Sequence, residues 1–279
     1  MVKIGEINKL KVVRIAEFGY YLDGKTSNTS DDILLPIKSA LGEKLDVGDE
    51  VEVFIYRDSQ DRMIATKKTP LAKVGEIAYL EVVDNSKIGA FISIGLERDV
   101  LVPFKEIKYK LEIGKKYLFY LYLDKTNRLA ATTNIDKYLH DTNSYNIGEE
   151  VEGTIYGLQT NGTAMIALEN IYRGVILKNE YYKDLKPGEI IKVRVKRYYE
   201  EGQVGVTSRK SRLVEKEDLE TTILNYLKQN NGSMKLNDKS SPEEIKSTFN
   251  TSKNAFKRAL GGLMKRSLII QDENGTKLI

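Results

Sequence analysis

Apolar and polar residues alternate along short stretches of most of the chain. Residues 50–56 read Glu-Val-Glu-Val-Phe-Ile-Tyr, and residues 191–196 read Ile-Lys-Val-Arg-Val-Lys. A period of two is typical of strands that bury one face, since successive side chains point to opposite sides. Gly- and Asp-rich turns separate these runs. The pattern predicts a mainly β fold up to about residue 213, followed by a helical region.

The same order of signals occurs three times in the β region. Gly5, Gly75 and Gly148 each open an apolar run, and another glycine follows 14 residues later in every copy. A repeat of about 70 residues is too long for a solenoid and suits a small domain. About five short strands per copy, without a strong helix, predict a closed barrel, because closure removes exposed sheet edges.

We therefore expect four domains. Three barrels are predicted over residues 1–70, 71–145 and 146–213, and a different, α+β unit over residues 214–279. The polar stretch Asp136 to Asn146 looks like a linker that ends the second domain. His140, within this stretch, is expected to be a solvated residue.

Short motifs mark the copies and carry a family resemblance. They are Val-Gly-Glu-Ile, then Phe-Gly-Tyr-Tyr-Leu or Ile-Gly-Ala-Phe-Ile, then Leu-Val-Pro, and finally Arg-x-x-Ala-Thr. In these motifs the chain resembles the S1 RNA-binding domain, an OB-fold barrel. The resemblance covers residues 1–67 and 73–134 well and residues 146–209 more weakly.

The resemblance implies a set of RNA-binding residues. Phe18 and Tyr21 in the first copy and Phe91 in the second match the aromatic rings that stack on bases in that family. Arg62 and Arg128 match its basic residue before the last strand. An exposed ring can stack on any base, and a nearby arginine can hold phosphate. The alternative is that these rings belong to the barrel cores.

The third copy departs from this set. Asn161 and Ala164 stand at the matching aromatic places, and Gln203 replaces the arginine. A basic strand with adjoining tyrosines is the compensating feature, because cations interleaved with rings suit a single-stranded polyanion. The alternative is an ordinary solvated strand face. The candidate residues here are Lys192, Arg194, Lys196, Arg197 and Tyr198.

The last 66 residues read as helices followed by a hairpin. A first helix is expected from Asp218 to about Gln229. Ser241-Pro242-Glu243-Glu244 is a strong start signal for a second helix. Thr251 or Ser252 should cap a third helix, which should bury Phe256, Leu260 and Leu263. Asn274-Gly275 is a hairpin turn signal between two apolar runs.

Three helices and a hairpin resemble a winged-helix domain. One side of the third predicted helix is basic, because residues four apart share a face. Such a helix could enter a nucleic-acid groove, and the alternative is a protein-contact module. The candidate residues are Lys253, Asn254, Lys257 and Arg258.

The whole order of domains resembles the conserved virulence factor B family, also called the YitL-type proteins. The similarity is most specific in the tail, in Ser-Pro-Glu-Glu-Ile-Lys-Ser-Thr-Phe and Ser-Lys-Asn-Ala-Phe-Lys-Arg-Ala-Leu-Gly. It implies a post-transcriptional, virulence-factor-type regulator that binds RNA.

Composition narrows the chemistry. There are no cysteines and His140 is the only histidine, which excludes disulfides, thiolate chemistry and Cys/His metal sites. No cofactor or metal is expected. No apolar run approaches the roughly 18 residues of a membrane span, and the start lacks a signal-peptide pattern, so we expect a cytoplasmic protein without a membrane partner. The net charge of +4 is too small to indicate a polyanion partner by itself.

These observations predict a non-enzymatic protein that binds single-stranded RNA through tandem barrels and the winged helix to regulate gene expression. Three alternatives stay open at this point. The first is a DNA-binding transcription regulator that acts through the winged helix. The second is an adaptor in RNA processing. The third is a nuclease, for which the sequence offers only the adjacent pair Asp31 and Asp32 in a polar loop.

Overall fold

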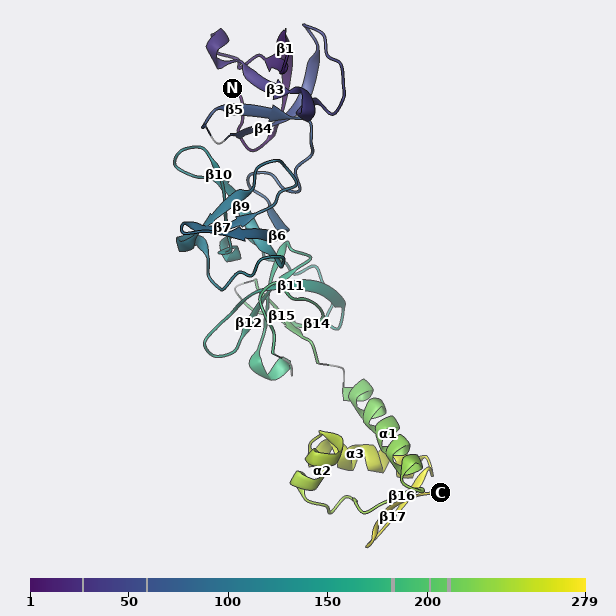
Figure 1. Ribbon diagram of the computed structural model, residues 1–279. Helices are drawn as coiled ribbons and strands as arrows, with labels where there is room; N and C mark the ends of the chain where they lie inside the picture. The colour runs from purple at the N-terminus through teal and green to yellow at the C-terminus, as the bar shows by residue number, and fades with distance from the viewer. Residues whose placement is uncertain (27, 59, 182–183, 201, 210–211) are drawn as a thin grey trace. The chain divides into compact units, whose positions relative to one another are not determined.

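The structure is a computed structural model that describes residues 1–26, 28–58, 60–181, 184–200, 202–209 and 212–279. It divides into two compact units, Met1–Ser208 and Arg209–Ile279 (Figure 1). The first unit holds all the barrel strands and the second holds the helices.

The first unit contains three closed five-stranded barrels. The first barrel consists of β1 (Ile7–Ala16), β2 (Gly19–Leu22), β3 (Ile33–Pro36), β4 (Glu50–Arg57) and β5 (Met63–Thr66), with 3₁₀ turns η1 (Thr29–Asp31) and η2 (Ile37–Ala40). The second consists of β6 (Ile77–Asn85), β7 (Gly89–Ile92), β8 (Val100–Pro103), β9 (Lys116–Leu123) and β10 (Leu129–Thr132), with η3 (Phe104–Glu106). The third consists of β11 (Glu150–Leu158), β12 (Ala164–Leu168), β13 (Tyr172–Ile176), β14 (Ile190–Tyr198) and β15 (Val204–Thr207), with η5 (Lys178–Glu180).

All three barrels have one topology. When the five strands of a barrel are numbered in chain order, their order around the barrel is first, second, third, fifth and fourth. The third and fifth strands pair in parallel, and the other pairs are antiparallel. The prediction of three OB-type barrels is therefore confirmed, including the third copy, in which the motifs are weakest.

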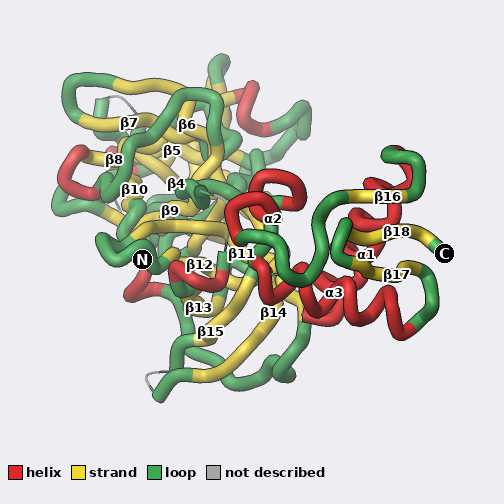
Figure 2. The backbone as a smooth tube through the Cα atoms, turned by 90° about the horizontal axis from the view of Figure 1, so that it is seen from below, coloured by secondary structure: helices red, strands yellow, loops and turns green. Residues whose placement is uncertain are grey.

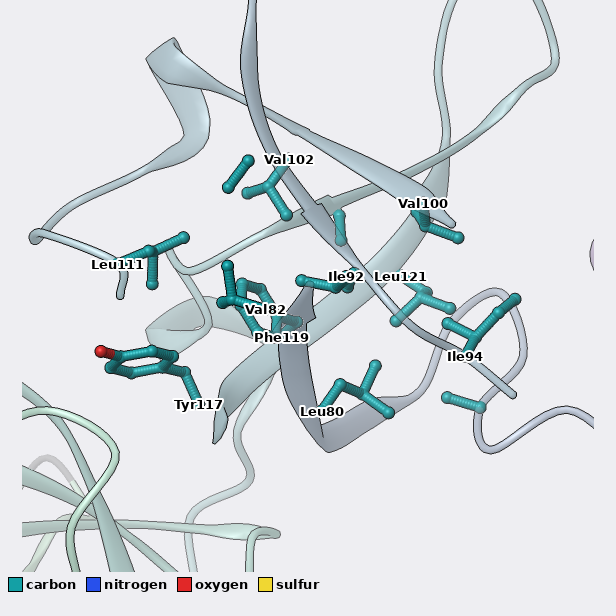
Figure 3. Close-up of a cluster of buried hydrophobic side chains, with 13 residues drawn as sticks. Leu80, Val82, Ile92, Ile94, Val100, Val102, Leu111, Tyr117, Phe119 and Leu121 are labelled. Carbon is teal, nitrogen blue, oxygen red and sulfur yellow. The ribbon is translucent and has the colours of Figure 1, made fainter. Parts of the chain in front are cut away.

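The alternating pattern explains each barrel core. In β9, Phe119 and Leu121 are fully buried inside the second barrel, where they meet Leu80, Val82 and Ile92. Figure 3 shows these side chains converging from several strands. Each Leu, Ile or Phe contributes roughly 1.5–3 kcal/mol by leaving water, so a core of this kind can stabilise a small barrel.

The segment between the second and third barrels is packed rather than solvated along its first part. Ile135 and Leu139 are buried with Leu118 of β9 and Tyr156 of β11 in one cluster, around the turn η4 (Asp136–Tyr138). The expectation of a plain polar linker misses this because only two apolar side chains mark the contact.

Polar bonds hold the same segment to the third barrel. The Tyr156 hydroxyl donates to Asp136 at 2.6 Å, and the Arg173 guanidinium donates to Asp141 at 2.7 Å. Burial and the hydrogen bond to Asp136 raise the pKa of Tyr156 well above its ordinary value. The side chain of His140 is exposed, as expected, but its backbone bonds to β13 through the Arg173 amide at 2.8 Å.

The second unit is a winged-helix domain, as predicted. Its sheet has the order β16-β18-β17, which Figure 2 shows as three neighbouring strands. Of the helices in the described part of the chain, none combines the length and apolar character that a membrane crossing requires. The elements are α1 (Arg212–Gln229), β16 (Ser233–Met234), α2 (Pro242–Phe249), α3 (Lys253–Lys265), β17 (Ile269–Asp272) and β18 (Gly275–Leu278).

The predicted starts of α2 and α3 are confirmed, because each helix is capped by a side chain within its first turn. Ser241 and Glu244 form a capping box at α2, and Ser252 caps α3 by accepting from the Ala255 amide. On α3 the buried residues include the predicted Phe256, Leu260 and Leu263, all at most 1% exposed.

Two details of this unit differ from prediction. Helix α1 begins at Arg212 and not at Asp218, because residues with ordinary helix propensity extend it without a cap signal. Asp272 pairs with Gly275, so the hairpin loop is Glu273–Asn274 rather than Asn274–Gly275. Gly275 is needed for another reason: a Cβ there would lie 2.0 Å from the Met234 carbonyl oxygen of β16.

Two adjacent glycines in α3 are predicted to respond in opposite ways to alanine. A Cβ on Gly261 would meet nothing within 4 Å, whereas one on Gly262 would lie 1.9 Å from the buried Glu220 carboxylate. Because Arg266 and Lys216 hold Glu220, it cannot retreat freely. Gly261→Ala should stabilise the unit by roughly 0.5–1 kcal/mol, and Gly262→Ala should destabilise it by about 1–3 kcal/mol.

Amide hydrogen exchange of α3 in the full chain measures both effects. The two variants have the same composition and adjacent positions, so each is the control for the other. Equal changes in protection would contradict the close approach of α1 and α3 at Gly262.

Candidate nucleic-acid interface

The first barrel presents an aromatic surface on its outer side. Tyr21 of β2 pairs with Arg14 of β1 and Leu34 of β3, and Leu34 pairs with Ile64 of β5. The Arg14 guanidinium lies 3.7 Å from the Tyr21 ring centroid. Phe18 meets the same ring edge-on, at 6.2 Å between centroids and 76° between planes. We call Arg14, Phe18, Tyr21, Leu34 and Ile64 the first-barrel face.

The rings of this face are accessible. Phe18 is 59% exposed and Tyr21 is half-buried, so neither belongs to the core, whereas Leu22 next to Tyr21 is fully buried. Arg14 is exposed and was not among the sequence candidates. A bulge between Val12 and Arg14 shifts the register there, so the outward position of Arg14 does not follow from alternation.

Arg62 lies beside this face but is already paired. Its Nε and Nη2 donate to one carboxylate oxygen of Asp58 at 3.0 and 2.8 Å. Burial alone would raise the pKa of Asp58, but hydrogen bonds from Arg62 and from the Gln60 amide lower it. A pocket of about 410 Å³ adjoins Tyr21 and is lined by Arg62, Arg57 and Asp58 among others.

The second barrel has a similar face with different charge. Phe91, at the position of Tyr21, pairs with Asp84 and Leu101, and Leu101 pairs with Ala130. Phe91 is half-buried. Asp84 takes the place that Arg14 has in the first barrel, so this face lacks the cation beside its ring.

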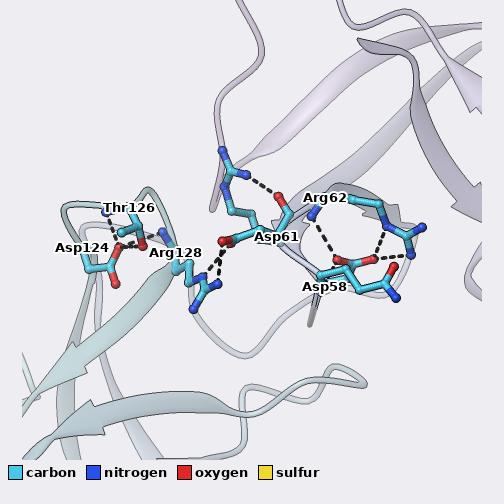
Figure 4. Close-up of polar contacts among 8 residues, drawn as sticks. Asp58, Asp61, Arg62, Asp124, Thr126 and Arg128 are labelled. Atoms are coloured by element: carbon cyan, nitrogen blue, oxygen red, sulfur yellow. Dashed lines mark hydrogen bonds and ion pairs between the residues drawn. The ribbon is translucent and has the colours of Figure 1, made fainter. Parts of the chain in front are cut away.

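Arg128 reaches from the second barrel to the first. Its Nε and Nη2 donate to the two carboxylate oxygens of Asp61 at 2.6 and 2.5 Å, in the fork geometry that Figure 4 shows. The hydrogen bond from Arg128 lowers the pKa of Asp61, and the same bond raises the pKa of Arg128. The pair is therefore charged at neutral pH, and acid weakens it by protonating Asp61.

Phe91 and Arg128 line one pocket of about 340 Å³ together with residues of the first barrel. Tyr56 and Arg57 of β4 form part of its wall. The structure thus brings together the two sequence candidates of the second barrel, next to two residues that sequence reasoning did not select.

In the third barrel, the position equivalent to Tyr21 and Phe91 is covered by the segment between the second and third barrels. By register, Met165 rather than Ala164 stands where Tyr21 and Phe91 stand, because the connection before β12 is one residue longer. Met165 packs on the cluster of Ile135 and Leu139 between the barrels. This face is used for intramolecular packing, which explains why it carries no aromatic ring.

The basic residues of β14 lie on its outer side, opposite carboxylates. Lys192 is exposed and Arg194 half-buried, and the antiparallel register sets Glu152 opposite Lys192 and Glu150 opposite Arg194. Directly opposed residues lie close enough for opposite charges to interact. This strand is therefore less positive than its sequence suggests.

The end of β14 differs from its start. Lys196 forms an ion pair with Glu180. After a bulge, Arg197 is exposed, and its stem lies over Gly205 of β15, where a Cβ would meet it at 2.8 Å. The Tyr198 hydroxyl donates to the Tyr145 carbonyl oxygen at 2.8 Å, so this ring is held in place.

The register also explains why β14 is basic. Arg194 and Arg197 take the places that Phe54 and Tyr56 occupy on β4. Phe54 and Tyr56 point outward from the first-barrel core and are nevertheless only 1% and 4% exposed. Their rings stack on each other, and Tyr56 lies beside second-barrel residues. No further barrel follows β15 in the described part of the chain, so the same positions can be charged there.

On α3 the candidate residues lie opposite the buried side of the helix. Asn254, Lys257 and Arg258 are exposed, and Lys253 is half-buried. Lys253 donates to the Lys239 carbonyl oxygen at 3.2 Å, and Lys257 lies 3.5 Å from the Asp238 carboxylate. The outward side of α3 thus keeps a polar and basic character.

Family models match both units. A model described as "S1 domain" matches residues 4–68 and 74–134, and one described as "CvfB-like winged helix domain" matches residues 221–278. The third barrel lies outside these ranges and is assigned by its strand order. Both kinds of domain are nucleic-acid-binding folds, so the domain content indicates nucleic-acid binding.

Related proteins cover nearly the whole chain. The uncharacterized protein YitL of Bacillus subtilis strain 168 is 34% identical, with 97% of this chain and 92% of that protein covered. Conserved virulence factor B of Staphylococcus epidermidis is 28% identical, with 95% and 91% covered. The crystal structure of a multidomain protein with nucleic acid binding domains from Streptococcus pneumoniae is 25% identical, with a TM-score of 0.53 and 99% and 98% covered.

Domain order, barrel topology and identity over almost the full length agree with one another. The chain belongs to the conserved virulence factor B family, the YitL-type proteins.

Proposed function

We propose that this protein binds single-stranded RNA without cleaving it and thereby regulates gene expression after transcription. The exposed first-barrel face carries the proposal: two rings and a guanidinium lie together on an outer barrel surface. Such a surface stacks on unpaired bases for roughly 1–3 kcal/mol each. The regulatory part rests on membership of the family.

Single strands are favoured over duplexes for a physical reason. Bases in a helix are stacked on one another, so a protein ring can reach their faces only where they are unpaired. Stacking accepts every base, because each has a π-face. We therefore expect affinity for single-stranded RNA with modest discrimination between sequences.

The basic candidate residues of β14 and α3 add electrostatic contacts to phosphate that differ in strength. Arg197 and Arg258 are exposed and can reach phosphate, whereas Lys192 and Arg194 have carboxylates opposite them. Each phosphate contact releases a counterion and makes binding more salt-sensitive. For single strands, the slope of the logarithm of the binding constant against the logarithm of the salt concentration becomes more negative by about 0.7 per phosphate. A few such contacts spread over tethered modules give weak, salt-dependent binding that adds up along one RNA.

Fluorescence anisotropy with the full chain tests the proposal. A labelled mixed-sequence RNA of about 12 nucleotides, within the site sizes known for OB barrels, should bind at low salt and weaken as salt rises. A duplex DNA of equal length should bind less tightly. Absence of RNA binding at low salt would refute the proposed function.

The exposed side of α3 favours a second candidate, duplex DNA binding by the winged helix. Asn254, Lys257 and Arg258 lie where a recognition helix presents groove contacts. This candidate predicts tighter binding of the duplex than of the RNA, and loss of that binding in a Lys257→Glu, Arg258→Glu variant. Equal affinity of that variant for duplex DNA would exclude it.

A further inference from the structure

The pockets beside Tyr21 and Phe91 share part of their lining. Arg57 and Asp58, at the end of β4, line both. One pocket continues into the first-barrel face and the other into the face of the second barrel. The two aromatic positions therefore lie beside pockets that share two wall residues at the junction between the barrels.

The second pocket is built by both barrels. Phe91, Leu101 and Pro103 of the second barrel line it, together with Tyr56 and Arg57 of the first. Its volume of about 340 Å³ is at the small end of ligand pockets, which span about 300–1,000 Å³. Tyr56 and Phe91 give the pocket two rings, and its lining also holds three arginines (Arg57, Arg98 and Arg128) and three aspartates (Asp58, Asp99 and Asp124). Its size and mixed lining suit a nucleotide rather than a long apolar ligand.

One turn residue links the two barrels beside the pockets. Asp61 lies in the β4–β5 turn with φ +67°. Its carbonyl oxygen accepts a hydrogen bond from Arg57, and its carboxylate accepts hydrogen bonds from Nε and Nη2 of Arg128. A backbone bond from the Val74 amide to the Gly5 carbonyl oxygen, at 3.0 Å, also links the barrels. The Asp61–Arg128 contact joins a lining residue of one pocket to a lining residue of the other.

We propose that the two pockets are successive nucleotide sites of one groove, which binds a single RNA strand across the junction, and that Asp61 and Arg128 set their spacing. This inference rests on the proposed single-stranded RNA binding. Arg128 acts here as a positioning residue, since its Nε and Nη2 are both engaged by Asp61 and are not directed at phosphate.

A charge exchange tests the proposal in the full-length protein. Asp61→Arg and Arg128→Asp each place like charges at the junction, whereas the double variant restores an opposite pair with its direction reversed. Anisotropy is measured with RNAs of about 12 and about 5 nucleotides, since only the longer one is expected to reach both pockets. Lys125→Asp, in the same β9–β10 turn as Arg128 and exposed, is the control for net charge.

We expect each single exchange to weaken binding of the longer RNA by about tenfold or more and to change binding of the shorter RNA by less than about twofold. The double exchange should return the longer RNA to within about threefold of the native protein. Lys125→Asp should have only a small, salt-sensitive effect.

Three results would overturn the proposal. If the double variant binds the longer RNA as weakly as the Arg128→Asp variant does, Arg128 contacts RNA directly and does not position the pockets. If the native protein binds the longer RNA no better than the shorter one, the groove is not continuous, although the proposed function stands. If the native protein binds neither RNA, the proposed function and this inference both fail.

Discussion

Replacing both Phe18 and Tyr21 by alanine is expected to weaken binding of single-stranded RNA by at least about 2 kcal/mol, roughly 30-fold. Each ring offers a stacking surface, and loss of Tyr21 also removes the support of Arg14. The two effects need not add, because the rings touch each other at 6.2 Å between centroids. Anisotropy with an RNA of about 12 nucleotides measures the loss.

The barrel itself should tolerate these changes. Phe18 is 59% exposed and Tyr21 lies outside the core cluster, so their removal creates no internal cavity. Ile113→Ala is the matched control, because Ile113 is 58% exposed and lies in the loop before β9, away from both pockets. Native-like affinity of the Phe18, Tyr21 double variant would show that the first-barrel face is not the RNA site.

Ile135→Ala is expected to destabilise the contact between the second and third barrels by about 2–5 kcal/mol. Ile135 is fully buried in the cluster that contains Leu118 and Met165. Truncation leaves a cavity that the surrounding strands can fill only in part. Hydrogen exchange of β9 and β11 amides is the suitable measurement, since three barrels need not unfold in one two-state transition.

His140→Ala is the control within the same segment. The His140 side chain is exposed, so the substitution should change the stability of the contact between the barrels by no more than about 0.5 kcal/mol. Similar exchange protection in the two variants would mean that residues 135–141 contribute nothing to the junction, against the burial of Ile135 and Leu139.

The Asp61–Arg128 pair shows how a residue type can match a family motif and serve another contact. Arg128 fits the S1 pattern at the sequence level, yet its guanidinium forms a fork with a residue 67 positions earlier. A bidentate bond of this kind orients two domains because its two parallel hydrogen bonds permit one relative geometry. Sequence alone contains no signal for a partner at that separation.

Local patterns allowed much of the fold to be predicted. Alternation along β4 and β14 indicated strands, and the repeat of about 70 residues indicated three barrels. The Ser241 capping box and the Ser252 cap were readable because a helix start depends on side chains within one turn. The positions of Phe18, Tyr21 and Phe91 outside the barrel cores could also be predicted, since their place within the hairpin is local.

Other features depended on strand register and on neighbouring barrels. The bulge before Arg14 reverses which residues of β1 point outward, and one additional residue before β12 puts Met165 in the place of Ala164. The carboxylates opposite Lys192 and Arg194 lie about 40 residues away in sequence.

The amino-acid sequence by itself thus determined which elements form and which residue types could stack on bases, because these follow from periodicity, caps and turns over a few residues. Tertiary structure alone decided which barrel faces stay open. Phe18 and Tyr21 stay accessible on the first-barrel face, the face with Phe91 adjoins a pocket, and the position of Met165 is covered. That outcome depends on contacts between side chains far apart in the chain, which no local pattern encodes.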